Sequence, residues 1–173
     1  MITEPGARPE AWLYEALSAA RLRPYLAGAD GDPDAAWALY QWNLDVCAAF
    51  YAPLHWCEVA LRNAMHDALR AHYRTDHWWD AAPLDANGRA MVAKARSGQA
   101  ERKGRPAAPD DVVARLTLGF WVSLVSRGHS YDREFWHKSL HAAFPHYSGK
   151  RRDLHRELNA IRGFRTVDCT TVR

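Results

Sequence analysis

The chain has 173 residues, of which 48% are hydrophobic and 25% are charged, a composition typical of a folded globular protein rather than a disordered one. The formal net charge is only +3, so binding to a nucleic acid would have to depend on a local basic patch. No apolar run approaches the roughly 20 residues of a membrane span, and no basic-then-apolar leader opens the chain. The three cysteines and nine histidines form no metal-ligand motif. We therefore expect a cytoplasmic protein with no membrane contact, no metal and no cofactor.

The first third of the chain predicts a tail followed by helices. Residues 1–9 are polar and contain two prolines, which indicates a flexible tail. Apolar residues at helical spacing predict a short helix over residues 12–24. Residues 28–33 should form a loop, after which Asp32 or Asp34 can cap the next helix by accepting hydrogen bonds from its first N–H groups.

The middle of the chain carries the longest helical pattern. Aromatic and apolar residues three or four apart predict a helix over residues 35–51. Pro53 should kink or restart this helix, because proline lacks an N–H and clashes with the preceding turn. The restarted helix should reach Tyr73, and residues 77–80 should form a turn. A further helix is predicted over residues 84–95.

The last part of the chain predicts one exposed loop and three more helices. Residues 97–109 are rich in Gly, Pro, Lys and Arg, which favours a loop. Residues 110–125 are strongly apolar after an acidic start and predict one helix. A short helix over residues 131–143 and a final helix over residues 149–164 follow.

The pattern as a whole predicts an all-α fold, because no segment alternates polar and apolar residues as a strand does. We expect a single helical domain over residues 10–165 and an aberrant tail over residues 166–173. Residues 116–121 should lie at the buried centre, where Gly119 would let a neighbouring helix or Trp ring approach closely.

Short groups of residues follow one another in a particular order along most of the chain. They are Arg21-Leu22, Tyr25-Leu26, Ala38-Leu39-Tyr40, Trp42-Asn43, Pro53-Leu54, Glu58-Val59, Leu61-Arg62-Asn63, Trp78, Val112-Val113-Ala114, Leu116 to Trp121, Trp136, Leu140 and Phe144. In this order and spacing the chain resembles the Abi-like (abortive infection) proteins of the HEPN superfamily. The resemblance implies an up-down helical bundle of the HEPN type and, in many relatives, a metal-independent endoribonuclease. It also implies a role in antiviral defence or a toxin–antitoxin pair, with RNA, an antitoxin and a second copy in a homodimer as partners.

The signature of this family is an Arg followed by Asn or a similar polar residue and, a few residues later, a His. An imidazole can move a proton from a ribose 2′-hydroxyl while a guanidinium holds the phosphate. Residues 158–164 match the lead-in, and Arg165 aligns with the catalytic arginine. No His follows in residues 166–173, so the resemblance implies an inactive chain that is truncated before its last helix.

This tail has more than one conceivable origin. A one-base change of reading frame would turn residues 166–171 into Asn-Arg-Arg-Leu-His-His and restore the motif. Natural degeneration of the gene, or a pseudogene without function, would also leave a chain that lacks the motif. The alternative function is a non-catalytic module that binds RNA or another protein.

A polar series occupies one face of the predicted middle helix. Glu58, Arg62 and His66 are spaced four residues apart, with Asn63 beside them. One interpretation is a solvated face with an ion pair between Glu58 and Arg62. The other is a supporting polar network that meets the last helix and orients Arg165. Arg62 and His66 echo the family motif with a shorter gap, and we expect them to support the site rather than to catalyse.

The final predicted helix is strongly basic. Lys150, Arg151, Arg152 and Arg162 are candidate RNA-binding residues, because clustered cations beside the motif position suit a phosphate backbone. The alternative is ordinary solvated charge. A second basic stretch, residues 94–105, is interpreted as mobile surface.

Overall fold

The structure is a computed structural model that describes residue 12, residues 16–104 and residues 106–166. The predicted tail over residues 1–9 lies outside the described residues, as does nearly all of the predicted tail over residues 166–173.

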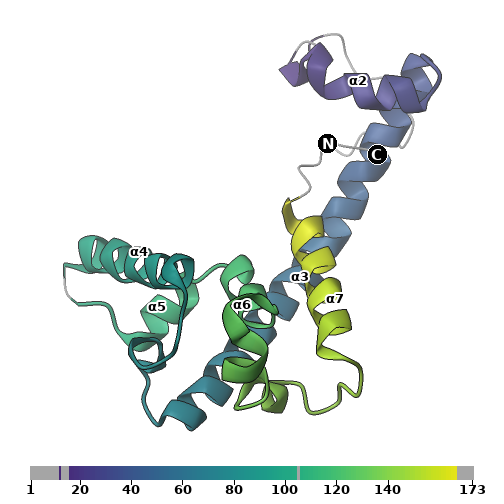
Figure 1. The fold of residues 1–173 in the computed structure, drawn as a ribbon. Helices are drawn as coiled ribbons and strands as arrows, with labels where there is room; N and C mark the ends of the chain where they lie inside the picture. Colours follow the sequence, from purple (N-terminus) through teal and green to yellow (C-terminus); the bar gives the residue numbers. More distant parts are fainter. Residues whose placement is uncertain (1–11, 13–15, 105, 167–173) are drawn as a thin grey trace. The chain divides into compact units, whose positions relative to one another are not determined.

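Every regular element in the described part of the chain is helical, and no strand occurs there, which confirms the all-α prediction (Figure 1). None of the described helices has the length and apolar character that a membrane crossing requires. The chain divides into two compact units, one comprising Met1–His55 with Phe164–Arg173 and the other Trp56–Gly163. The single domain over residues 10–165 stays a prediction.

The first unit is built on helix α2 (Ala19–Gly28) and the first part of helix α3 (Pro33–Tyr73). Tyr25 is fully buried and meets the ring of Tyr40 edge-on, with 5.1 Å between ring centroids. The side-chain amide of Asn43 donates a hydrogen bond of 2.9 Å to the Tyr25 hydroxyl. The Asp32 carboxylate accepts from the backbone N–H of Asp34 at 2.9 Å, which confirms Asp32 as the cap of α3.

Two prolines do not end helices where the sequence predicted it. Helix α2 continues through Pro24 to Gly28, and α3 continues through Pro53, so the predicted helix end at Pro24 and the restart at Pro53 are wrong. A proline removes only one backbone donor, and good helix formers on both sides of Pro53, such as Ala52 and Leu54, sustain the helix.

The core of the second unit is aromatic. Trp78 lies in the short helix η1 (Trp78–Asp80), and Phe120 and Trp121 lie in α6 (Leu118–Leu124). All three side chains have no exposed surface, and their ring centroids are 5.3–6.3 Å apart. This confirms the buried centre predicted over residues 116–121. The neighbour of Gly119 is a side chain of the last helix, since a Cβ there would lie 3.6 Å from the guanidinium of Arg162.

Several further elements surround this core. They are α4 (Ala86–Lys103), α5 (Pro109–Arg115), η2 (Gly128–Ser130), η3 (Asp132–Trp136), η4 (Leu140–Ala143) and α7 (Arg151–Thr166). Helix α7 agrees with the helix predicted over residues 149–164. Helix α4 extends past the predicted end at residue 95, so the first part of the predicted loop over residues 97–109 is helical. Its last turns consist of polar helix formers without an apolar stripe, which leaves no periodic signal in the sequence.

The apolar stretch over residues 110–125 is two helices rather than the one predicted. Leu116 and Thr117 are extended, with ψ angles of 124° and 159°, and separate α5 from α6. One straight helix that is apolar on every side would leave part of its surface exposed beside a single neighbour. Two short helices can turn their apolar faces toward different neighbours and bury more of that surface. The helix predicted over residues 131–143 is also divided, into the π-helical turn η3 and the 3₁₀ turn η4.

The first prediction concerns stability. Trp121→Ala should lower the free energy of unfolding by about 3–5 kcal/mol, because it removes a large, fully buried side chain and leaves a cavity in the core. Urea denaturation followed by circular dichroism measures this change. Trp56→Ala is the matched control: this side chain is 72% exposed, so its loss should change the free energy by only about 0.5 kcal/mol or less. Equal effects of the two substitutions would contradict the burial of Trp121.

Candidate functional site

A pocket of about 380 Å³ lies between α3 and α5 in the second unit, and we refer to it as the α3–α5 pocket. It is lined by Arg62, Asn63, His66, Asp67, Arg70, Asp110, Val113 and Ala114. Three of the four predicted network residues therefore meet at one pocket. Glu58, the fourth, is buried and does not line it.

His66 is held in one orientation by the aromatic core. The indole Nε1–H of Trp78 donates a hydrogen bond of 3.0 Å to His66 Nδ1, and both side chains are buried. Because Nδ1 is an acceptor here, the proton of the neutral ring is on Nε2. Burial lowers the pKa of His66 below its ordinary value of 6.5, so the ring is neutral at pH 7.

Arg62 also faces the pocket, and its hydrogen bonding is incomplete. One terminal nitrogen donates to the carbonyl of Ala114 in α5 at 3.3 Å. Its Nε–H is buried and has no hydrogen-bond partner in the described part of the chain. Glu58 and His66 are only 9% and 8% exposed, so the interpretation of this series as a solvated face is wrong.

The rim of the pocket carries charges that the sequence analysis missed. Arg70 lies between two carboxylates, 3.4 Å from Asp67 and 3.7 Å from Asp76. Asp110, at the start of α5, lines the opposite wall. The pocket thus contains two arginines and two carboxylates. Arg70 continues the four-residue spacing of Arg62 and His66 by one more turn, and that spacing could have identified it.

A second concavity, of about 600 Å³, lies at the start of α7 and is mostly positive; we call it the cationic cleft. It is lined by Arg127, Asp132, Lys150, Arg151, Arg152 and His155. Three predicted RNA-binding residues therefore lie together. The fourth, Arg162, is not among the lining residues, and its guanidinium lies near Gly119 instead.

The floor of the cationic cleft is anchored to the core. Arg151 donates a hydrogen bond to the carbonyl of Val125 at the end of α6. Burial, followed by the charges of Arg151 and Arg162, lowers the pKa of His155 below 6.5, so this ring adds no charge at pH 7. The permanent charges of Arg127, Lys150, Arg151 and Arg152 set the potential of the cleft.

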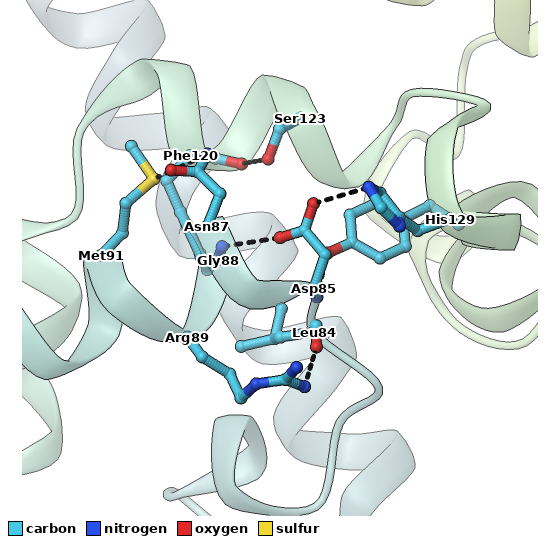
Figure 2. Close-up of polar contacts among 10 residues, drawn as sticks. Leu84, Asp85, Asn87, Gly88, Arg89, Met91, Phe120, Ser123 and His129 are labelled. Atoms are coloured by element: carbon cyan, nitrogen blue, oxygen red, sulfur yellow. Dashed lines mark hydrogen bonds and ion pairs between the residues drawn. The ribbon is translucent and has the colours of Figure 1, made fainter.

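Polar contacts join Asp85 to the segment between Arg127 and Asp132, two residues that line the cleft. Figure 2 shows Asp85 with Gly88 and His129. Asp85 caps α4 by accepting from the backbone N–H of Gly88 at 2.6 Å, and its second oxygen lies 3.2 Å from His129 Nε2. The backbone N–H of Asp85 donates to the Tyr131 hydroxyl at 2.7 Å. Burial raises the pKa of the Tyr131 phenol, which therefore stays protonated. Sequence reasoning missed this network, because its members come from separate segments and share no periodic spacing.

The predicted catalytic residue cannot be placed in either site. The backbone of Arg165 is in the last turn of α7, and its side chain lies outside the described residues. Among the side chains that are described, no group of three or more His, Cys, Asp or Glu residues could hold a metal ion.

The second prediction concerns pH. The pKa of His66 is lower in the folded chain than in the unfolded chain, so the unfolded chain binds a proton at this residue more readily. Above pH 6.5 the ring is neutral in both states and does not lower the free energy of unfolding. As the pH falls further, protonation of the unfolded chain lowers that free energy. His66→Gln keeps an acceptor for the Trp78 indole and does not titrate. It should therefore reduce the difference in unfolding free energy between pH 7.5 and pH 5. His72→Gln, at an exposed site on the same helix, is the control for a His-to-Gln change, and the reduction should be larger in His66→Gln than in this variant. An unaltered difference in His66→Gln would refute the assigned protonation state.

No protein-family model, curated protein or solved structure matches this chain. The assignment of a function therefore depends on the chemistry of the α3–α5 pocket and the cationic cleft, together with the resemblance seen in the sequence.

Proposed function

We propose that this chain is an Abi-like antiviral defence protein of the HEPN type that binds RNA through the cationic cleft. In this proposal the all-α fold is a HEPN-like bundle, and the intact form of the protein is a metal-independent endoribonuclease toxin of the cytoplasm. The present chain, without a His after Arg165, holds RNA but does not cut it.

The observation that supports this proposal is the charge of the cleft. Four cations and one carboxylate face a single concavity, although the net charge of the whole chain is only +3. Guanidinium groups match the oxygens of a phosphate with paired hydrogen bonds, and three of the four cations are arginines. Such a site attracts a phosphate backbone without reading its sequence.

A second candidate function is binding to another protein, and it has its own observation. Trp42, Phe50 and Tyr51 on the α3 segment of the first unit are 61%, 53% and 76% exposed. Large aromatic side chains at a surface are typical of protein interfaces. An antitoxin or a second copy of this chain, as in a homodimer, would suit these exposed aromatic side chains.

The third prediction tests the cleft. The chain should bind a single-stranded oligoribonucleotide, as fluorescence anisotropy measures, with an affinity that falls as salt rises. Replacing both Lys150 and Arg152 with Ala should weaken binding. It should also reduce the slope of log affinity against log salt by roughly 1.4, because each lost phosphate contact accounts for about 0.7.

The matched control is the double substitution Lys94→Ala with Arg133→Ala, which removes the same charge from exposed sites outside the cleft. Its salt slope should equal that of the wild type. If wild type and control bind no RNA at low salt, the proposal is wrong and the protein-binding candidate remains. If the cleft variant and the control variant lose affinity for RNA equally, RNA is attracted by the overall positive charge of the chain and the cleft is not the binding site.

The fourth prediction tests the enzyme. A chain with Thr166→Asn and Thr170→His restores the Arg-Asn-x-x-x-His spacing and should cleave RNA in the presence of EDTA. Adding Arg165→Ala to that chain should abolish cleavage, while the wild type should show none. RNA binding without cleavage in the restored chain would favour the non-catalytic module.

A further inference from the structure

We infer that the α3–α5 pocket binds a guanine base, presented either by a free guanine mononucleotide or by RNA; the RNA source rests on the proposed function. Its volume of about 380 Å³ is at the small end of ligand pockets. Nothing in the sequence resemblance assigns a ligand to this pocket, and its chemistry differs from that of the cationic cleft.

The inner part of the pocket offers hydrogen-bond donors. Arg62 lines the pocket, and only one terminal nitrogen of its guanidinium has a hydrogen-bond partner among the described residues, so the other terminal nitrogen is a donor for a ligand. His66 carries its proton on Nε2 because Nδ1 accepts from Trp78. A ligand with two neighbouring acceptors would satisfy both donors. The O6 and N7 atoms of guanine form such a pair on one edge of the base.

The rim offers acceptors at the same time. The carboxylates of Asp67 and Asp110 can accept from N–H groups, and guanine presents an N1–H and an exocyclic amine beside its O6. Adenine has an acceptor at N1, which an ionised carboxylate repels. The rim therefore favours guanine over adenine.

The remaining surfaces suit a flat ring. The Arg70 guanidinium is held by Asp67 and Asp76 and its side chain is 53% exposed, so a base can stack on it. Val113 supplies an apolar surface from the other helix. A bare phosphate would fit poorly, because two carboxylates offset the two arginines of this pocket.

Trp78 provides a direct reporter for this site. Its indole N–H is bonded to His66, so a ligand that binds to the other nitrogen of His66 should shift the indole cross-peak in a ¹⁵N–¹H correlation spectrum. Titration with 5′-GMP should shift this peak, which the spectrum of Trp78→Phe identifies. AMP and UMP carry the same phosphate and should bind at least tenfold more weakly.

Two substitutions test the contacts. Asp110→Asn should lower the affinity for GMP about tenfold or more, since it replaces an ionised acceptor by a neutral amide. Asp45→Asn, on an exposed part of α3 in the first unit, should leave that affinity unchanged. An equal response to GMP and AMP, or an equal loss in both variants, would overturn the inference.

A second measurement tells whether the base comes from a free nucleotide or from RNA. It compares, by fluorescence anisotropy, the binding of uridine decamers that carry one central G or one central A. A GMP-induced shift of Trp78 with tighter binding of the G decamer supports a base presented by RNA. A GMP-induced shift without binding of either decamer supports a free nucleotide, and the proposed function then fails while this inference stands. Equal binding of both decamers without a GMP-induced shift refutes this inference and leaves the proposed function intact.

Discussion

The hydrogen bond from the Trp78 indole to His66 joins the core of the second unit to its surface chemistry. One edge of the Trp78 ring system packs among Phe120 and Trp121, and its nitrogen fixes an imidazole at a pocket. A buried hydrogen bond of this kind is costly to leave half-made, so the position of the ring and the tautomer of the histidine stabilise each other. The orientation of His66 on α3 is therefore a consequence of how the aromatic core is packed.

The cationic cleft and the α3–α5 pocket of the second unit differ in the charges that line them. The cationic cleft has charges of mainly one sign, which give attraction without much selectivity. The α3–α5 pocket has balanced charges and oriented donors and acceptors, which give selectivity without long-range attraction. A chain with a formal net charge of only +3 can thus contain a strongly positive site, because its charges are segregated rather than averaged over the surface.

The sequence predicted those features that depend on the spacing of residues within one helix. Helix α7 follows from a clear apolar stripe, and the four-residue spacing of Arg62 and His66 predicted that they share one helix face, where both line the α3–α5 pocket. The break at Leu116 and Thr117 was not predictable, because it depends on which faces of α5 and α6 find neighbours. Arg127 joins the cleft through the tertiary path of the chain, which local periodicity does not encode.

The short link that contains His129 and Ser130 has a wider consequence. Both residues have left-handed backbone conformations, with φ angles of 54° and 61°, which cost non-glycine residues on the order of 1 kcal/mol each. The contacts of Asp85 hold this link in place, so little freedom is left to the wall of the cleft. A polyanion would therefore bind to a pre-organised surface. The protein would lose less conformational entropy on binding than a flexible basic tail would lose.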